Sequence, residues 1–330
     1  MSVFFAARHF RAEREGDWAR LEELLDRVEK ASPRTLTDAD LTDLPRLYRA
    51  TLSALSVARA TSLDAGLVAY LEALSTRAYF VLYGCREPWG RQVIAFFTHH
   101  WPRAVRAVAP ELFLALALLL LSAFAGYHLV RSEPAWFAAM IPPEMAQGRD
   151  MAASAATLRA SLYDPPESGG LEVFATALFT HNSQVSILAF ALGFAFGIPT
   201  MILAVQNGAS AGALFAAFVP HGLGWGLFCW LMIHGTTEIL AIALASAAGI
   251  HIGRAVAFPG ERTRMAAAAA AGRRGALVMI GVVVMLLFAG LLEGFGRQLV
   301  RDDGARLAIG AGMLLLWTLY FTLGGRRGAA

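Results

Sequence analysis

Cysteine and lysine are almost missing from this chain of 330 residues, which holds two cysteines and a single lysine, Lys30. Cys85 falls in a charged segment and Cys229 in an apolar one, so we expect no disulfide and interpret both as small buried side chains. Phosphate-binding loops of the Gly-Lys type and Cys-x-x-Cys pairs do not occur. We therefore expect neither an enzymatic activity nor a cofactor.

Charge is also scarce, and it is unevenly distributed. Charged residues make up 16% of the chain and apolar residues 57%, against about 25% and about 45–50% in ordinary globular proteins. Charge is dense up to about residue 107 and sparse beyond it. We expect a cytosolic helical bundle with an interfacial helix at 1–107. A transmembrane domain is expected at 108–330, with an extracytoplasmic loop at 131–172.

Apolar residues repeat at helical spacing in three stretches of the first region. Ser32-Pro33 separates the first two, Thr37 and Asp38 offer a helix cap, and Gly84 follows the third. A fourth segment, from Trp89 to Val108, combines aromatic residues with arginines and is typical of an interfacial helix. The three stripes predict a small bundle. They are Trp18, Leu21, Leu24, Leu25 and Val28; Leu41, Leu44, Leu47, Tyr48, Leu52 and Leu55; and Leu63, Leu67, Leu71, Leu74, Ala78 and Val81.

Long apolar runs in the second region predict about six membrane-spanning helices, because a span needs about 20 apolar residues. The polar run at 181–184 is expected to separate a short surface helix at 171–181 from the second span. Asn207-Gly208 is interpreted as a tight turn, and Pro220-His221-Gly222 interrupts the third span. The fold class is thus an all-α polytopic membrane bundle. The expected spans are 108–130, 184–205, 209–227, 228–250, 276–292 and 307–323.

Arginine placement decides whether segment 209–227 crosses the membrane. Residues 251–275 carry five arginines and one acid, and Arg326-Arg327 follow the last span. Both lie inside, as the positive-inside rule requires, only if segment 209–227 crosses. The N-terminus becomes charged within a few residues and lacks a signal peptide's apolar core, so it is expected in the cytoplasm. The net charge of +3 is attributed to topology, and no nucleic acid partner is expected.

Polar residues within the spans are candidate functional residues, because such groups are costly in a bilayer unless they are paired. His234 and Glu238 are four residues apart and so share one helix face. Three interpretations stay open: a structural clamp between helices, a proton or ion relay, and a metal site with His181 or His221 as third ligand. The His-Glu-x-x-His metalloprotease signature does not occur. The intramembrane polar set is His234, Glu238, His221, Asn182, Asn207 and Glu293.

Glycines spaced four residues apart predict close helix packing. Gly193 and Gly197 form one such face, and Gly208 and Gly212 form another. Gly235 lies between the candidate His and Glu. These faces predict packing within the chain first and a homodimer second.

Together these motifs resemble the stage II sporulation protein M family. The resemblance rests on Asn182 followed by Phe190, Gly193, Gly197 and Asn207-Gly208, on His234-Gly235-Thr236-Thr237-Glu238, and on Glu293-Gly294-Phe295. Trp18-x-x-Leu21, Leu47-Tyr48-Arg49 and Ala58-Arg59 are similar to the N-terminal extension of the long, non-sporulating members. Two departures stand out. Sporulation-specific members lack this N-terminal part, and Ile233 stands before His234 where the family usually has proline.

The resemblance implies a non-enzymatic role, because sporulating members are membrane anchors that recruit peptidoglycan-remodelling enzymes. For this chain it implies a multi-pass scaffold of the bacterial inner membrane, in contact with lipids, envelope proteins and a second copy of itself. One alternative is a transporter or channel that uses His234 and Glu238. A weaker alternative is a metal-dependent intramembrane hydrolase.

Overall fold

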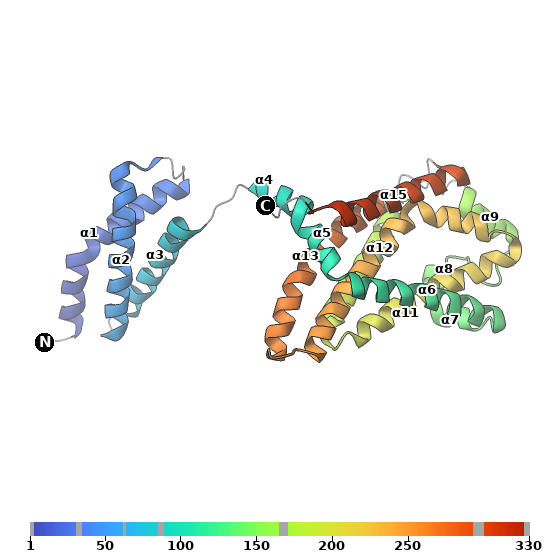
Figure 1. Cartoon of the computed structure of the whole chain (residues 1–330), viewed down its shortest axis with the longest axis horizontal. Helices are drawn as coiled ribbons and strands as arrows, with labels where there is room; N and C mark the ends of the chain where they lie inside the picture. The colour runs from blue at the N-terminus through green and yellow to red at the C-terminus, as the bar shows by residue number, and fades with distance from the viewer. Residues whose placement is uncertain are drawn as a thin grey trace. The chain divides into compact units, whose positions relative to one another are not determined.

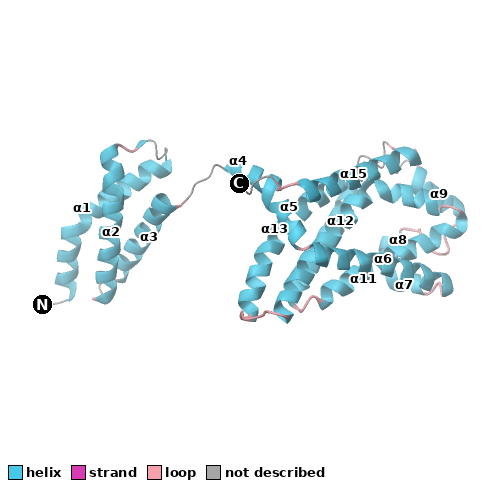
Figure 2. Cartoon of the chain, viewed as in Figure 1, coloured by secondary structure: helices cyan, strands magenta, loops and turns pink. Residues whose placement is uncertain are grey.

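The computed structural model describes residues 3–30, 35–61, 64–84, 89–164, 171–292 and 300–326, and these residues form helices and connecting loops without strands (Figures 1 and 2). The chain divides into two compact units, Met1–Arg91 and Gln92–Ala330. The prediction of an all-α membrane bundle with an N-terminal helical region is confirmed.

The first unit contains α1 (Val3–Lys30), α2 (Asp38–Ala60) and α3 (Ala65–Tyr83), which pack on one another. All five members of the first predicted stripe, Trp18 to Val28, are buried. The second stripe is partly wrong, because Leu41 and Leu52 are 54% and 39% exposed. Leu67, Leu71, Leu74 and Ala78 of the third stripe are buried. The spacing therefore identified the core except at two positions on α2, and Leu63 lies outside the described residues.

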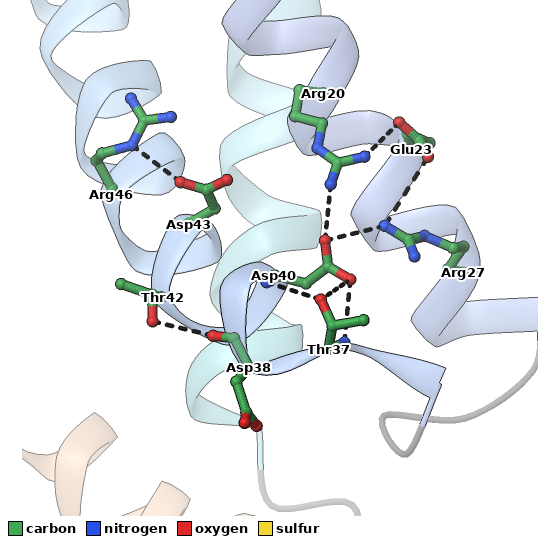
Figure 3. A network of polar contacts seen from close by, with 9 residues as sticks. All are labelled: Arg20, Glu23, Arg27, Thr37, Asp38, Asp40, Thr42, Asp43 and Arg46. Carbon is green, nitrogen blue, oxygen red and sulfur yellow. Dashed lines mark hydrogen bonds and ion pairs between the residues drawn. The ribbon is translucent and has the colours of Figure 1, made fainter.

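A buried carboxylate joins α1 to the start of α2 (Figure 3). Asp40 Oδ1 accepts hydrogen bonds from Arg20 at 2.7 Å and Arg27 at 3.2 Å. Its Oδ2 accepts from the Thr37 backbone N–H at 3.0 Å and from the Thr37 hydroxyl at 2.9 Å. Thr37 in turn caps α2 in a capping box, as its position in the sequence predicted. One side chain thus both starts α2 and holds α1 against it.

The second unit begins with a bent helical segment, α4 (Trp89–Ala95), a π-turn at Phe96–His100 and α5 (Trp101–Ala107). The exposed Trp89 and Ile94 fit the predicted interfacial helix. Trp101, however, is 2% exposed and lies directly on Gly281 of α13 (Arg264–Leu291). The second half of the segment is therefore part of the membrane bundle's core.

Five described helices are long and apolar enough to cross a membrane. They are α6 (Ala109–Ser132), α11 (Ile198–Phe218, continued to His221 by a 3-10 turn), α12 (Gly224–Ala257), α13 and α15 (Asp303–Leu323). A shorter apolar stretch, Asn182–Phe194, begins in α10 (Leu171–Ala191) and ends in the 3-10 turn Leu192–Phe194. α12 is central: 72% of its apolar window is buried, against 22–44% for the other four, and it packs on α6, α10, α11, α13 and α15.

Three predicted boundaries are wrong. The expected surface helix 171–181 and the start of the span 184–205 form one helix, α10, because the polar run at 181–184 does not break it. The break comes at 192–197 instead, where Phe196 and Gly197 have φ of 59° and 74°. Asn207-Gly208 is not a turn but the middle of α11, and Pro220-His221-Gly222 connects α11 to α12. The sequence predicts Gly197 as a packing residue only, whereas its left-handed conformation also makes the turn between α10 and α11.

Short helices cover the end of the bundle where α11 ends and α12 begins. These are α7 (Trp136–Met140), α8 (Pro143–Ala146) and α9 (Ala155–Tyr163). Phe137, Leu158 and Leu162 are buried together with Phe218 and Leu227. The predicted extracytoplasmic loop therefore has a core shared with the membrane helices.

We predict that the first unit loses stability in acid. The Thr37 N–H, the Thr37 hydroxyl and the Arg27 guanidinium hold the pKa of Asp40 below its ordinary value of 3.8. Because the unfolded chain then takes up this proton at higher pH, the stabilisation is complete above about pH 5 and is lost as pH falls through the folded-state pKa.

In a fragment of residues 1–91, Asp40→Asn is expected to lower the thermal midpoint at pH 7, with the difference from the parent shrinking in acid. Asp43→Asn, on an exposed pair with Arg46, is the control and should change the midpoint little. Equal losses at pH 7 would contradict the assignment.

Candidate functional site

His234 and Glu238 lie one turn apart on α12, as their spacing predicted. His234 Nε2 is 4.0 Å from Glu238 Oε2, which is an ion-pair distance and longer than a hydrogen bond. The His234 side chain is 6% exposed and that of Glu238 is 19% exposed. The Trp230 ring stands edge-on to His234 at 5.6 Å.

This stretch of α12 is the surface on which α15 packs. The Trp317 indole of α15 donates a hydrogen bond to the Thr237 hydroxyl at 3.1 Å, and both side chains are buried. At Met232, two residues before His234, Gly310 of α15 lies so close to the carbonyl that an added Cβ would be 2.4 Å from its oxygen. Residues beside the candidate pair thus make a helix–helix contact, and the structural clamp by His234 and Glu238 themselves stays a prediction.

Of the other predicted polar residues, His221 is placed away from this pair. His221 is exposed in the α11–α12 connection, and His234 lies ten residues into α12, about 15 Å along its axis. Asn207 donates to the Leu203 carbonyl of its own helix at 2.9 Å. Asn182 is buried on α10. Glu293 and the side chain of His181 lie outside the described residues.

Four of the five predicted glycines are in close helix contacts within the chain. A Cβ added at Gly193 would lie 2.3 Å from the Gly249 carbonyl oxygen. One added at Gly212 would lie 1.9 Å from the Ala123 carbonyl oxygen. Gly208 lies equally close to Leu119 of α6. Gly197 is matched on α12 by Gly253, whose added Cβ would be 2.2 Å from the Gly197 nitrogen. At Gly235, by contrast, an added Cβ would have only ordinary contacts, at 3.8 Å and beyond.

The homodimer prediction rested on these glycine faces. Because Gly193, Gly208 and Gly212 meet α12 or α6 of the same chain, a dimer needs a different surface. The dimer stays a prediction that this spacing no longer supports.

Residues 208–212 also spell Gly-x-Ser-x-Gly, a pattern used by serine hydrolases. A nucleophile elbow needs a sharp turn between a strand and a helix, whereas these residues lie inside α11. The Ser210 hydroxyl contacts the Met140 carbonyl oxygen at 2.8 Å and the Gln206 carbonyl oxygen at 2.9 Å. Ser210 therefore ties α7 to α11.

A second buried polar cluster was not predicted. Glu111, in the first turn of α6, is 3% exposed, and its Oε1 is 3.0 Å from His251 Nδ1 and 2.8 Å from Arg254 Nη2 on α12. Arg274 Nη1 of α13 is 3.4 Å from His251 Nε2. A guanidinium can only donate, so Nε2 is the acceptor and the proton of a neutral His251 lies on Nδ1, facing Glu111. Three helices meet at this Glu111 cluster.

The sequence did contain signals for the Glu111 cluster. Glu111 follows Pro110 at the start of an apolar run, a position where a carboxylate also faces the positive end of its helix. His251 and Arg254 are three residues apart near the end of another run. The positive-inside rule alone accounts for Arg254 and Arg274 in the sequence, because sequence distance hides that α6 and α12 are neighbours.

A buried arginine fastens the opposite end of the bundle. Arg306 of α15 is 1% exposed and donates to the Leu162 carbonyl of α9 at 2.9 Å and to the Val300 carbonyl at 3.0 Å. Tyr163 donates to Asp303 at 2.9 Å, and burial first, then that carboxylate, raises the pKa of the Tyr163 hydroxyl. This contact fixes α9 to the start of α15.

These contacts mainly connect helices. The described residues contain no group of three or more His, Cys, Asp or Glu side chains placed to hold a metal ion. His234–Glu238 on α12 and His251–Glu111 between α12 and α6 are histidine–carboxylate pairs that can exchange protons.

Glu111 is predicted to contribute more to stability than the arginine that it contacts. Glu111→Gln removes a buried charge that is hydrogen-bonded to His251 and paired with Arg254, and it should cost about 1.5–3 kcal/mol for the charged hydrogen bond alone. Arg254→Gln should cost at most about 1 kcal/mol, because the Arg254 side chain is 57% exposed. Unfolding of both variants in mixed detergent micelles measures the difference. Equal costs would show that the buried contact to His251 contributes little.

Comparison with known proteins supports the family resemblance. A family model described as stage II sporulation protein M matches residues 93–296, and one described as a domain of unknown function (DUF8413) matches residues 8–84. The comparison with curated proteins found no match, and neither did the comparison with solved structures. The first match covers more than half of the chain and falls within the second unit. This multi-pass membrane protein therefore belongs to the stage II sporulation protein M family.

Proposed function

We propose that the protein is a non-enzymatic scaffold of the bacterial inner membrane that serves envelope or peptidoglycan-related assembly. The observation that carries this proposal is the use of buried polar groups in the second unit. Thr237, Glu111 and Arg306 each bind a residue on another helix. A membrane domain whose polar side chains fix helices in place suits an anchor.

The first unit offers a surface for a partner. Tyr79, Phe80 and Tyr83, near the end of α3, are 51%, 58% and 62% exposed, and their rings contact one another and Tyr48. Clustered exposed aromatic side chains are typical anchors of protein interfaces. We call these four residues the aromatic cluster and propose that it binds the partner protein.

Transport is the second candidate function, and one observation favours it. α12 contributes a histidine to each of two histidine–carboxylate pairs, and Glu111 Oε2 of α6 is buried without a hydrogen-bond partner among the described residues. Buried carboxylates and histidines form proton relays in membrane pumps. A transporter would use His234 and Glu238 as titrating groups.

Two measurements on the same preparations separate these functions. A photo-reactive residue at Phe80 should cross-link in cells to one discrete envelope protein. The same residue at Leu41, which is also an exposed apolar position of the first unit at 54%, should not.

In proteoliposomes with an internal pH dye, the wild type and Glu238→Gln should show the same background proton flux. Uptake that Glu238→Gln abolishes would instead establish transport, and equal cross-linking from both positions would remove the proposed docking surface.

The proposed orientation predicts opposite labelling of two loops. In a background with Cys85→Ser and Cys229→Ala, a cysteine at Asp164, after α9, should react with a membrane-impermeant maleimide added outside intact cells. A cysteine at Gly260, in the loop rich in arginine, should react only after the cells are opened, because arginines are retained inside. Both positions are exposed, so accessibility within the protein does not bias the result. The reverse pattern would invert the topology.

A further inference from the structure

An apolar pocket lies where α10 ends, α12 ends and α13 begins. It encloses about 490 Å³, within the range of about 300–1,000 Å³ that is common for ligand pockets. Its walls include Phe190, Phe194, Ile252, Val256 and Ala268. Arg264 is the charged residue of this lining. The pocket thus combines a long apolar surface with a single cation.

Arg264 differs from two nearby arginines, Arg254 and Arg274. Arg254 and Arg274 contact Glu111 and His251. Arg264 is exposed and makes no ion pair or hydrogen bond within the part of the chain that the structure describes. Glu261 is the lone acid of this loop, and Arg262 adds a further positive charge. An anion is therefore the ligand that the mouth of the pocket favours.

The surroundings of the pocket indicate a lipid as that anion. Phe194, Phe196 and Phe258 are 64%, 50% and 81% exposed near the same helix ends. Exposed aromatic side chains beside arginines, at the ends of membrane helices, are typical of the bilayer interface. Basic pockets between membrane helices bind anionic lipid headgroups.

We propose that this pocket binds an anionic glycerophospholipid, with one acyl chain between α10, α12 and α13 and the phosphate paired with Arg264. The apolar walls accept any acyl chain, whereas Arg264 selects the headgroup. One basic residue near an anionic lipid contributes about 1 kcal/mol, which is about a fivefold preference over a zwitterionic lipid.

Glycine substitutions can fill the pocket without disturbing the helices. Gly272 lines the pocket, and an added Cβ there would meet no atom within 4 Å. Gly272→Leu should therefore occupy the space while leaving the backbone unchanged. Gly312 on α15 has the same open surroundings but lies outside the pocket, so Gly312→Leu is the matched control. Arg264→Gln tests the cation, and Arg131→Gln, an exposed arginine at the other end of α6, is its control.

Native mass spectrometry of the purified full chain counts bound lipids directly. Phosphatidylglycerol and phosphatidylethanolamine with identical acyl chains are the probes, and inorganic phosphate is added as a competitor. We expect one phosphatidylglycerol bound about fivefold more tightly than phosphatidylethanolamine, and not displaced by phosphate. Gly272→Leu should lose both lipids, and Arg264→Gln should bind both equally. Circular dichroism melts confirm that each variant is folded.

Three results would overturn the proposal. If Gly272→Leu retains phosphatidylglycerol as Gly312→Leu does, the lipid binds elsewhere. A headgroup preference that Arg264→Gln keeps, or that Arg131→Gln loses, would remove the role of Arg264. Displacement by inorganic phosphate would show that the anion alone is recognised.

Discussion

Close backbone contact between α12 and its neighbours is the constraint on which the membrane unit depends. Lipid tails are as apolar as leucine, so helices in a bilayer associate by packing and hydrogen bonds rather than by the hydrophobic effect. Gly249 and Gly253 of α12 lie directly against Gly193 and Gly197, and α15 approaches Met232 through Gly310. A side chain at any of these contacts would force two helices apart. The positions of α15 and of the end of α10 against α12 follow from these small residues.

The same close packing places the polar groups. Once α6 lies beside α12, Glu111 has no access to water and needs partners, which His251 and Arg254 supply. Arg306 likewise satisfies its guanidinium on the carbonyls of Leu162 and Val300. Removing Glu111 would leave His251, which is also buried, without its carboxylate. The polar contacts therefore lock an arrangement that glycine contacts permit, in the middle of the bundle and at both of its ends.

The local sequence pattern predicted those features that depend only on residues close by in the chain. Thr37 identified the start of α2, the Trp18 to Val28 stripe identified a core face, and the spacing of His234 and Glu238 put them on one face of α12. The local pattern failed where contact with a neighbouring helix determines the structure. Asn207-Gly208 has the composition of a turn, yet Asn207 bonds within its own helix and Gly208 lies against α6, so the helix continues. The Glu111–His251 contact joins residues 140 positions apart, and only the packing of α6 on α12 shows it.

The arginines illustrate how such a bundle uses one residue type for several purposes. The positive-inside rule counts every arginine near a span alike, but their surroundings separate them. Arg106 binds the carbonyls at the end of α15, Arg306 fastens α9, and Arg254 pairs with Glu111. These side chains act within the protein, and their charge is already balanced or shared.

Arg264 has no such contact among the described residues and lines an apolar pocket. A charge without an internal partner at a membrane interface is balanced from outside, and the anions at hand there are lipid phosphates. One set of arginines thus holds the helices together, whereas Arg264 is the arginine that we propose binds a lipid.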